Sequence, residues 1–324
     1  MHARCGVVVV GSFNVDHVWT VDALPIPGQT LAGTYRSGPG GKGFNQAVAA
    51  ARTGADTTFV CALGADAGGQ LARALANADG IDLRDLASDL PTGTAGINVD
   101  ADGRNSIVIG AGANAMLSVA HVEAQRACVA AATVLLAQLE SPIEAVQHAL
   151  RIARAAGCVA MLNPAPANAA STGALLAGCD VLTPNETEFA ALLGLHAHVD
   201  IDADSVAALD DAALHAYCRT LLPHGTVVVT LGAAGCFVSH AADSMRGDAS
   251  ASRRVDAPCV EAIDTTGAGD AFNGALASSL AQQPDMAFAV HVAFAVRYAS
   301  HSTTQPGAAA AMPRLRVMAE AAST

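Results

Sequence analysis

The sequence predicts an α/β protein in which a doubly wound, mostly parallel β-sheet is flanked by helices. Short β-rich runs alternate with longer helical stretches along most of the chain, which is the pattern of strand–helix–strand units. Several runs are apolar at consecutive positions, as expected for parallel strands covered on both faces. Of 324 residues, 52% are hydrophobic and 14% charged, which supplies the core of one large domain over residues 1–324.

The individual elements follow from this alternation. Six apolar runs are predicted as strands of the main sheet: 7–10, 58–62, 133–139, 158–162, 180–182 and 226–231. The longer stretches are predicted as helices: 44–52, 69–78, 118–132, 143–156, 186–193, 205–222, 268–281 and 286–300. Residues 240–256 are predicted to form a surface hairpin or loop.

Two segments, 13–37 and 94–109, interrupt the alternation because they contain strand-like runs joined by turns, with no helix between them. Asp102-Gly103 is a hairpin turn signal flanked by alternating residues. We expect these segments to form a small β-layer that projects from the main sheet. Such a layer has an apolar face to bury, which favours pairing with a second copy of the chain.

Charge and cysteine usage exclude several classes of protein. Lys and Arg number 17 against 29 Asp and Glu, and this acidic balance without a basic block argues against nucleic-acid binding. No apolar run reaches the roughly 18 residues of a membrane span. The eight cysteines include no CxxC pair and most lie in apolar runs, which predicts buried, reduced thiols and a cytoplasmic protein.

The most specific local pattern is DTTGAGDAFNG at residues 264–274. Gly267 and Gly269 permit a tight turn before a helix, and the free N–H groups at a helix start form an anion site. Asp270 would stand beside that anion, where a carboxylate can accept a proton from an attacking hydroxyl. An ordinary acidic N-terminal turn is the alternative, but it does not explain the glycines, Asp264 and the two threonines together.

A second glycine-rich pattern, GPGGKGFN at residues 38–45, precedes a predicted helix. It matches G-x-G-x-x-G, but it follows the β-layer and contains a proline, which is unlike a dinucleotide fingerprint. Lys42 is followed by Gly43, so the pattern is not a Walker A loop either. We interpret it as backbone that approaches a small ligand, with Lys42 and Asn45 as polar arms.

Polar residues also follow the predicted strands. Ligands of open parallel sheets bind beyond the carboxyl ends of the strands, so these positions are candidates for one shared site. The alternative is that strands simply turn polar as they leave the core. The residues concerned are Asn14, Asp16, Glu140, Asn163, Asn185, Thr230 and Gly232.

Together these segments resemble the ribokinase-like (PfkB) carbohydrate kinases over nearly the whole chain. The matching segments are GSFNVD (11–16), PGGKGFNQAVAAARTGA (39–55), GAGANAMLS (110–118), QLESP (138–142), LNPAPA (162–167), TPNETE (183–188), TLGAAG (230–235) and DTTGAGDAFNGAL (264–276). The resemblance implies the corresponding fold, with the β-layer of segments 13–37 and 94–109 as a lid.

The resemblance also implies residue roles. Sugar hydroxyls would be held by Asn14, Asp16, Gly41, Lys42, Asn45 and Glu140. Asp270 would be the base, and Gly267, Ala268 and Gly269 would form the anion hole. The nucleotide would contact Asn185, Thr230, Gly232, Gly235 and Gly269. Glu188 would be associated with Mg²⁺, and K⁺ or another monovalent cation would be bound by Asp264, Thr266, Ser302, Gln305, Gly307 and Ala311.

The activity implied by the resemblance is transfer of the γ-phosphoryl group of ATP to the 5-hydroxyl of D-ribose, giving D-ribose 5-phosphate. A related kinase acting on fructose, deoxyribose or a ribonucleoside remains open. ATP is the implied co-substrate, Mg²⁺ and K⁺ are the implied cofactors, and a homodimer formed through the lid is the implied assembly. A dinucleotide oxidoreductase and a non-catalytic ligand sensor are the competing classes.

Overall fold

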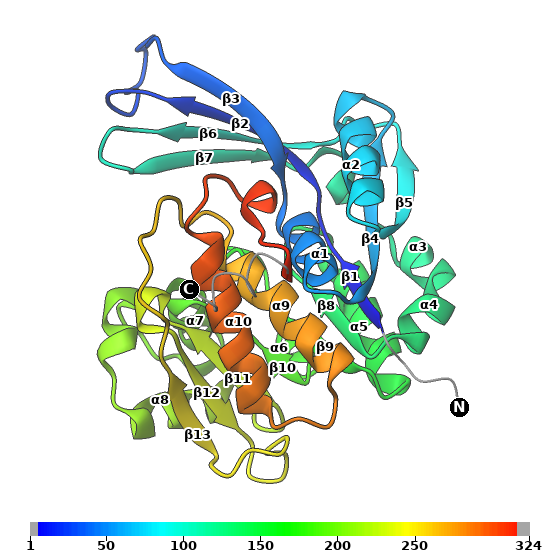
Figure 1. Ribbon diagram of the computed structural model, residues 1–324, viewed down its shortest axis with the longest axis vertical. Coiled ribbons are helices and arrows are strands. Elements are labelled where there is room, and N and C mark those ends of the chain that lie inside the picture. The colour runs from blue at the N-terminus through cyan, green and yellow to red at the C-terminus, as the bar shows by residue number, and fades with distance from the viewer. Residues whose placement is uncertain (1–5, 316–324) are drawn as a thin grey trace.

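A computed structural model describes residues 6–315 and contains a nine-stranded main sheet (Figure 1). The strand order is β13 (Ser252–Val255), β12 (Cys236–His240), β11 (Thr226–Thr230), β10 (Val181–Leu182), β9 (Val159–Leu162), β8 (Val134–Ala137), β1 (Gly6–Val10), β4 (Asp56–Gly64) and β5 (Asp82–Ser88). All neighbours pair in parallel except β11 with β12 and β12 with β13. The predicted fold class is confirmed.

The central strands are apolar throughout because helices cover both faces of the sheet. Val7 and Val9 of β1 point into one core, whereas Val8 and Val10 point into the other. The first core packs against α1 (Lys42–Arg52), α2 (Ala67–Ala78), α9 (Ala268–Gln282) and α10 (Phe288–Ser302). The second packs against α3 (Val119–Ala124), α4 (Arg126–Ala131), α5 (Ile143–Ala155), α6 (Gly173–Leu176), α7 (Glu186–Ala197) and α8 (Asp211–Leu221).

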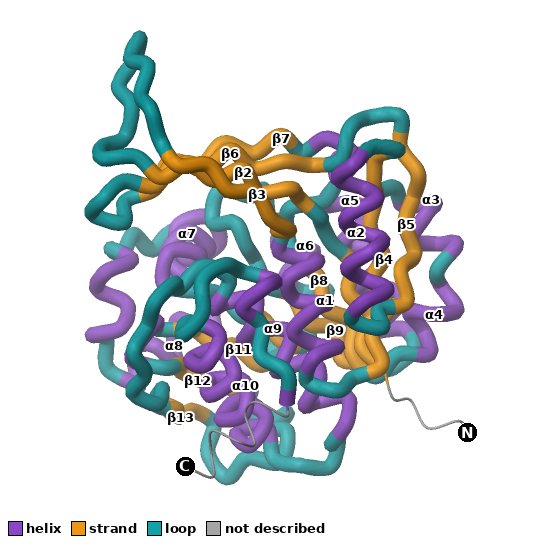
Figure 2. Tube along the Cα trace, turned by 45° about the horizontal axis from the view of Figure 1, so that its top comes forward, coloured by secondary structure: helices purple, strands orange, loops and turns teal. Residues whose placement is uncertain are grey.

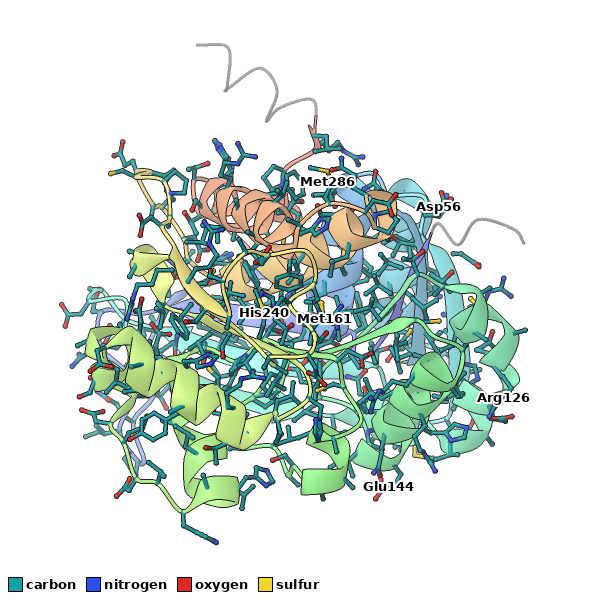
Figure 3. All side chains as sticks on the ribbon, turned by 90° about the horizontal axis from the view of Figure 1, so that it is seen from below. Asp56, Arg126, Glu144, Met161, His240 and Met286 are labelled. Carbon is teal, nitrogen blue, oxygen red and sulfur yellow. The ribbon has the colours of Figure 1, made fainter. Side chains whose placement is uncertain are left out.

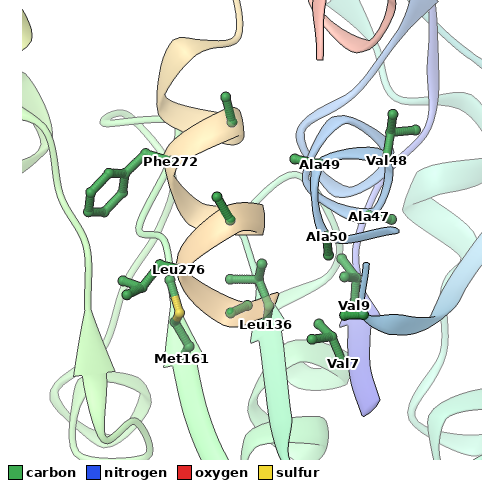
Figure 4. Close-up of a cluster of buried hydrophobic side chains, with 14 of the residues drawn as sticks. Val7, Val9, Ala47, Val48, Ala49, Ala50, Leu136, Met161, Phe272 and Leu276 are labelled. Carbon is green, nitrogen blue, oxygen red and sulfur yellow. The ribbon is translucent and has the colours of Figure 1, made fainter. Parts of the chain in front are cut away.

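Helices α1 and α9 lie side by side over the middle of the sheet (Figures 1 and 4). A Cβ on Gly274 of α9 would overlap the carbonyl oxygen of Gln46 and the side chain of Ala49 in α1. Glycine at this position therefore allows the two helix backbones to touch. This contact brings the first turns of both helices to the same edge of the sheet.

Several predicted boundaries differ from the structure. The expected helix 118–132 is divided at Gln125 into α3 and α4, and Ser118 caps α3 by accepting a hydrogen bond from His121 N. The expected helix 205–222 consists of a 3₁₀ segment, Ala203–Ala208, followed by α8, which Asp210 caps. Asp210 thus starts a new helix within a stretch whose apolar pattern is continuous, whereas the division at Gln125 has no side-chain cap.

Two parts of the sheet were not predicted. Strand β5 lies at the sheet edge and has no buried residue, so it lacks the apolar run that marks the other strands. Within residues 240–256, predicted as a hairpin or loop, His240 ends β12 and the stretch 252–255 forms β13, which extends the main sheet. His240 at the end of β12 and Met161 in β9 are both buried, whereas Arg126 and Glu144 are exposed (Figure 3).

The predicted β-layer is a separate four-stranded sheet that stands away from the main body (Figure 2). Its order is β3 (Thr34–Gly40), β2 (Asn14–Thr20), β6 (Gly93–Val99) and β7 (Asn105–Gly110), with β2 and β6 parallel and the outer pairs antiparallel. Gly103 adopts φ 78° in the turn between β6 and β7. The assignment of residues 1–324 to a single domain stays a prediction, because both termini lie outside the described residues.

Among residues 6–315, no helix is both long and apolar enough to cross a membrane. Most of the cysteines in this part of the chain are buried, as expected. The exceptions are Cys128, which is half-buried, and Cys259, which is exposed. Cys5 lies outside the described residues.

Candidate active site

Asp270 occupies the first turn of α9 and is only 6% exposed. The helix begins after Gly267, which has φ 78° and lies against Ala308, so a side chain at position 267 would be strained and crowded. Within residues 6–315, the N–H of Gly269 has no acceptor, and the space beside its Cα is open. Ala268 N donates to the carbonyl of Thr265 at 3.2 Å. The turn therefore presents an open backbone edge beside a buried carboxylate.

The carboxylate of Asp270 is held by two amides from α1. Asn45 Nδ2 donates to Oδ2 and Gln46 Nε2 donates to Oδ1, both at 2.9 Å. Burial raises the pKa of Asp270, while the nearby Lys42 ammonium and these two hydrogen bonds oppose that rise. The arrangement keeps a carboxylate in a buried site with its two oxygens fixed in place.

Next to Asp270 lie the other residues predicted to bind a sugar. Glu140 accepts hydrogen bonds from Ser12 Oγ at 2.6 Å and from the backbone N–H of Lys42 at 3.0 Å. The pKa of Lys42 is raised although burial lowers it, because the carboxylates of Asp270, Glu140 and Glu188 surround its ammonium. Lys42 therefore stays charged at the point where these acids converge.

Two further candidates, Asn14 and Asp16, reach the site from strand β2 of the small sheet. Buried Asn114 donates to Asn14 Oδ1 at 2.8 Å, which fixes the orientation of the Asn14 amide. Burial, together with the charges of Glu140 and Asp270, raises the pKa of Asp16 to about 6. The structure thus brings these two polar groups of the small sheet beside the groups carried by α1.

A polar cavity of about 140 Å³ lies at the start of α9 and is lined by Lys42, Asn163, Ala165, Thr183, Asn185, Glu188, Thr230, Thr265, Gly267, Ala268, Gly269, Asp270 and Asn273. A second cavity of about 540 Å³ adjoins it and shares Asn185, Thr230, Thr265, Ala268 and Gly269. Its walls are largely apolar and include Ala257, Pro258, Val260, Phe272, Val296 and Ala299. Gly232 and Gly235, predicted to bind a nucleotide, line this larger cavity with φ of 53° and 84°. The backbone edge at Gly269 stands where the two cavities meet.

Asn185 and Glu188 form a capping box at the start of α7. Asn185 Oδ1 accepts from Glu188 N at 2.8 Å, and Glu188 Oε2 accepts from Asn185 N at 2.9 Å. Burial raises the pKa of Glu188, with Asp270 adding to the effect and Lys42 opposing it. The capping box uses one carboxylate oxygen of Glu188. The other oxygen remains available, and Glu188 lines the polar cavity.

The residues predicted to bind a monovalent cation are only partly brought together. Asp264 accepts from Thr266 N at 2.9 Å and from Gly307 N at 2.8 Å. Burial raises the pKa of Asp264, but these hydrogen bonds bring it below its ordinary value. Ser302 instead donates to Ala299 O within its own helix, and Gln305 is exposed. Ala311 is buried and donates its N–H to Ala308 O.

Sequence reasoning missed the buried polar residues behind the site. All of them are buried, and all except Asn114 lie within three positions of a predicted residue, which was the available signal: Ser12, Gln46, Asn114, Gln138 and Asn273. Their importance depends on contacts between segments far apart in the chain. For example, Asn45 and Asp270 are separated by 225 positions.

The family model of the pfkB family carbohydrate kinases matches residues 6–315. The chain belongs to this family. It is 38% identical to the ribokinase of Haemophilus influenzae over 314 residues, which is 96% of both chains. Among solved structures, ribokinase from Giardia lamblia matches with a TM-score of 0.85 and 30% identity over 99% of each chain. Arabidopsis thaliana ribokinase complexed with ribose and ATP matches with a TM-score of 0.83 and 28% identity over 98% of each chain.

Proposed function

We propose that this pfkB-family protein is an ATP-dependent kinase that phosphorylates the 5-hydroxyl of D-ribose. The observation that carries the proposal is the position of Asp270. Its buried carboxylate stands between a cluster of polar groups suited to sugar hydroxyls and an open helix start suited to a phosphoryl group. The likeness to ribokinases, one of them complexed with ribose and ATP, supports ribose as the acceptor.

In the proposed reaction, the sugar lies between the small sheet and α1. Asn14, Asp16, Lys42, Asn45 and Glu140 offer both donors and acceptors, as a polyhydroxylated ligand requires. Asp270 accepts the proton of the 5-hydroxyl as the hydroxyl oxygen attacks the γ-phosphorus. The bond from that phosphorus to the β,γ-bridging oxygen breaks, and ADP leaves with the bond's electron pair.

The nucleotide would occupy the larger cavity with its γ-phosphate at the junction beside Gly269. The apolar walls suit the faces of a purine, and the open space beside the Cα of Gly232 leaves room for ribose and phosphates. Free N–H groups and the positive end of α9 would stabilise charge on the transferred phosphoryl group. The polar cavity supplies Lys42 as a further positive charge on that path.

Two cations complete the proposal. Within residues 6–315, no group of three or more His, Cys, Asp or Glu side chains is placed to hold a metal, so the metal sites would depend on other oxygen ligands. Glu188 fits an Mg²⁺ bound together with the phosphates, because the capping box uses only one of the two carboxylate oxygens of Glu188. Asp264 with the backbone around Gly307 fits K⁺. When bound, these cations neutralise phosphate charge.

The small sheet is proposed to act as a lid and as the surface of a homodimer. It carries exposed apolar side chains, among them Trp19, Tyr35, Ile107, Val108 and Ile109. A lid over the sugar would exclude water, which would otherwise accept the phosphoryl group. Multi-angle light scattering on the purified protein tests the dimer, and a monomeric mass would contradict it. The mostly buried thiols fit the proposed reducing, cytoplasmic environment.

The direct test is ADP release from purified protein with Mg-ATP and K⁺. We expect turnover that requires D-ribose and a product whose phosphate is on the 5-oxygen, established by phosphorus and proton NMR. Fructose, 2-deoxyribose and ribonucleosides serve as competing acceptors. Equal ADP release with and without ribose, or a clearly higher kcat/KM for another acceptor, would contradict the proposed acceptor. Replacing K⁺ with tetramethylammonium tests the cation separately.

A further inference from the structure

Gln46 is a fully buried amide in the second turn of α1, with no exposed surface. It follows Asn45 directly, so the two side chains leave the helix about 100° apart. Both nevertheless reach the same carboxylate, because α9 crosses close to α1 at Gly274. A buried polar side chain is expected to have its hydrogen-bonding groups satisfied, and this one does.

Every hydrogen-bonding group of the Gln46 amide has a partner. Nε2 donates to Asp270 Oδ1 at 2.9 Å and to Asn163 Oδ1 at 3.0 Å. Oε1 accepts from Gln138 Nε2. These partners fix which end of the amide faces Asp270, since a carboxylate accepts and cannot donate. Gln46 is therefore held in one orientation with a hydrogen aimed at the carboxylate.

The hydrogen bonds continue from Gln46 through the ends of two core strands to the start of α9. Asn163, after β9, donates to the carbonyl of Thr183, after β10, at 2.9 Å. Thr183 Oγ1 bonds to Asn273, whose Nδ2 donates to the carbonyl of Gly269 at 2.8 Å. This series of hydrogen bonds thus contacts the carboxylate of Asp270 at one end and the backbone carbonyl of the neighbouring residue, Gly269, at the other.

We propose that Gln46 is a positioning residue for phosphoryl transfer, holding the Asp270 carboxylate in place through Oδ1 while Asn45 holds Oδ2. This role rests on the proposed function of Asp270 as the base. Gln46 need not touch the substrate, because its amide is already saturated by Asp270, Asn163 and Gln138. Its effect is to keep Asp270 ionised and correctly oriented as the acceptor hydroxyl arrives.

The electrostatic setting makes this hydrogen bond important. Asp270 is faced by Lys42 from α1, by Glu140 after β8, by Asp16 from β2 and by Glu188 from α7. One ammonium thus stands among several acids, in a buried place that favours the protonated carboxyl. The amide donors oppose protonation, because hydrogen bonds to the charged form stabilise it.

The test replaces Gln46 with methionine, which keeps the length of the side chain and removes the donor. We expect the acid limb of the kcat profile, measured at saturating ribose, to move up by about one pH unit, the shift expected from losing one hydrogen bond to a charged group. At neutral pH, kcat should fall by about tenfold, while KM for ATP stays within about twofold. Gln46→Glu is the second variant, since it keeps the shape and places a second carboxyl against Asp270.

Gln282→Met is the matched control. Gln282 of α9 donates to the carbonyl of Thr53 after α1, so it also links the two helices, but at the end away from Asp270. The control should leave the pH profile unchanged. A fall in kcat in Gln46→Met with the acid limb unmoved would reduce Gln46 to a merely structural role and overturn the proposal.

A direct titration keeps this test independent of the kinase assay. In protein labelled with carbon-13 at the aspartate carboxyl, the Asp270 signal is identified by its loss in Asp270→Asn. We expect its midpoint to rise in Gln46→Met and Gln46→Glu; an unmoved midpoint in whichever variant folds overturns the proposal. If the midpoint rises but ribose is not phosphorylated by the unmodified protein, the assignment of the acceptor fails and the positioning of Asp270 stands.

Discussion

The carboxylate of Asp16 lies directly over the Cα of Gly40, in the space that a side chain at position 40 would fill. The two residues are on neighbouring strands β2 and β3, where Asp16 pairs with Gly38 and Gly40 pairs with Asn14. The absence of a side chain at Gly40 thus decides where a predicted sugar ligand can point. This relationship connects the glycine-rich segment to the small sheet.

Gly40→Ala should displace the Asp16 carboxylate while leaving the fold intact, because a flexible side-chain end can move away from the added methyl group. We expect KM for the sugar to rise about tenfold or more, the effect of losing one hydrogen bond to a charged group. KM for ATP should not change. Gly38→Ala is the matched control, since its added methyl would meet nothing within 4 Å. Similar sugar KM values in both variants would contradict the role of Asp16.

Sugar binding should weaken in acid because of Asp16. Its pKa is raised to about 6 by burial and by the charges of Glu140 and Asp270, so the carboxyl is protonated below that pH. A protonated carboxyl loses acceptor capacity, so KM for the sugar should rise as pH falls through 6. In Asp16→Asn the pH dependence of this KM should disappear, and the KM should be high throughout. Steady-state kinetics between pH 5 and 8 measure both.

The raised pKa of Asp16 also makes the free energy of unfolding depend on pH. The folded state holds the Asp16 proton more tightly than the unfolded state, whose pKa is near 3.8, so the free energy of unfolding falls as pH rises from about 4 to 6. The Asp16→Asn variant does not lose stability in this way, because asparagine does not ionise. We therefore expect the variant to be more stable than the unmodified protein at pH 7 and to show a smaller difference at pH 4. Urea unfolding at the two pH values tests this, and an equal difference at both would contradict it.

Asp270→Asn keeps the shape of the side chain and removes the proton acceptor. We expect kcat to fall by at least about two orders of magnitude, the usual scale of general base catalysis. ATP binding, measured by calorimetry, should be little changed, because the larger cavity does not include Asp270. Asp285→Asn, at an exposed position, is the control. Activity close to that of the unmodified protein would remove Asp270 from the role of base.

Gly269→Ala should separate stability from activity. Residue 269 is helical, and an added methyl would meet no protein atom within 4 Å, so alanine should stabilise α9 by about 0.5–1 kcal/mol. The methyl would enter the junction of the two cavities, where the phosphoryl group is proposed to lie. We expect a higher Tm together with a large fall in kcat. Undiminished turnover would place the phosphoryl group elsewhere.

Much of the fold was predictable because the relevant signals are local. Strands covered on both faces are apolar at every position, and the helices between them are long enough to be recognised from their pattern. Strand β5 was not predicted because an exposed edge strand needs no apolar run. The division of helix 118–132 at Gln125 was not predicted because no capping side chain marks it.

Residue types and spacing alone determined the fold class, the glycine turn before α9 and the candidacy of Asp270, because each depends on neighbours in the chain. Only the tertiary structure decided which amides hold that carboxylate and that Asp16 rests on Gly40. These outcomes depend on close packing between distant segments. The approach of α1 to α9 at Gly274 is set by the volumes of facing residues, which no local pattern specifies.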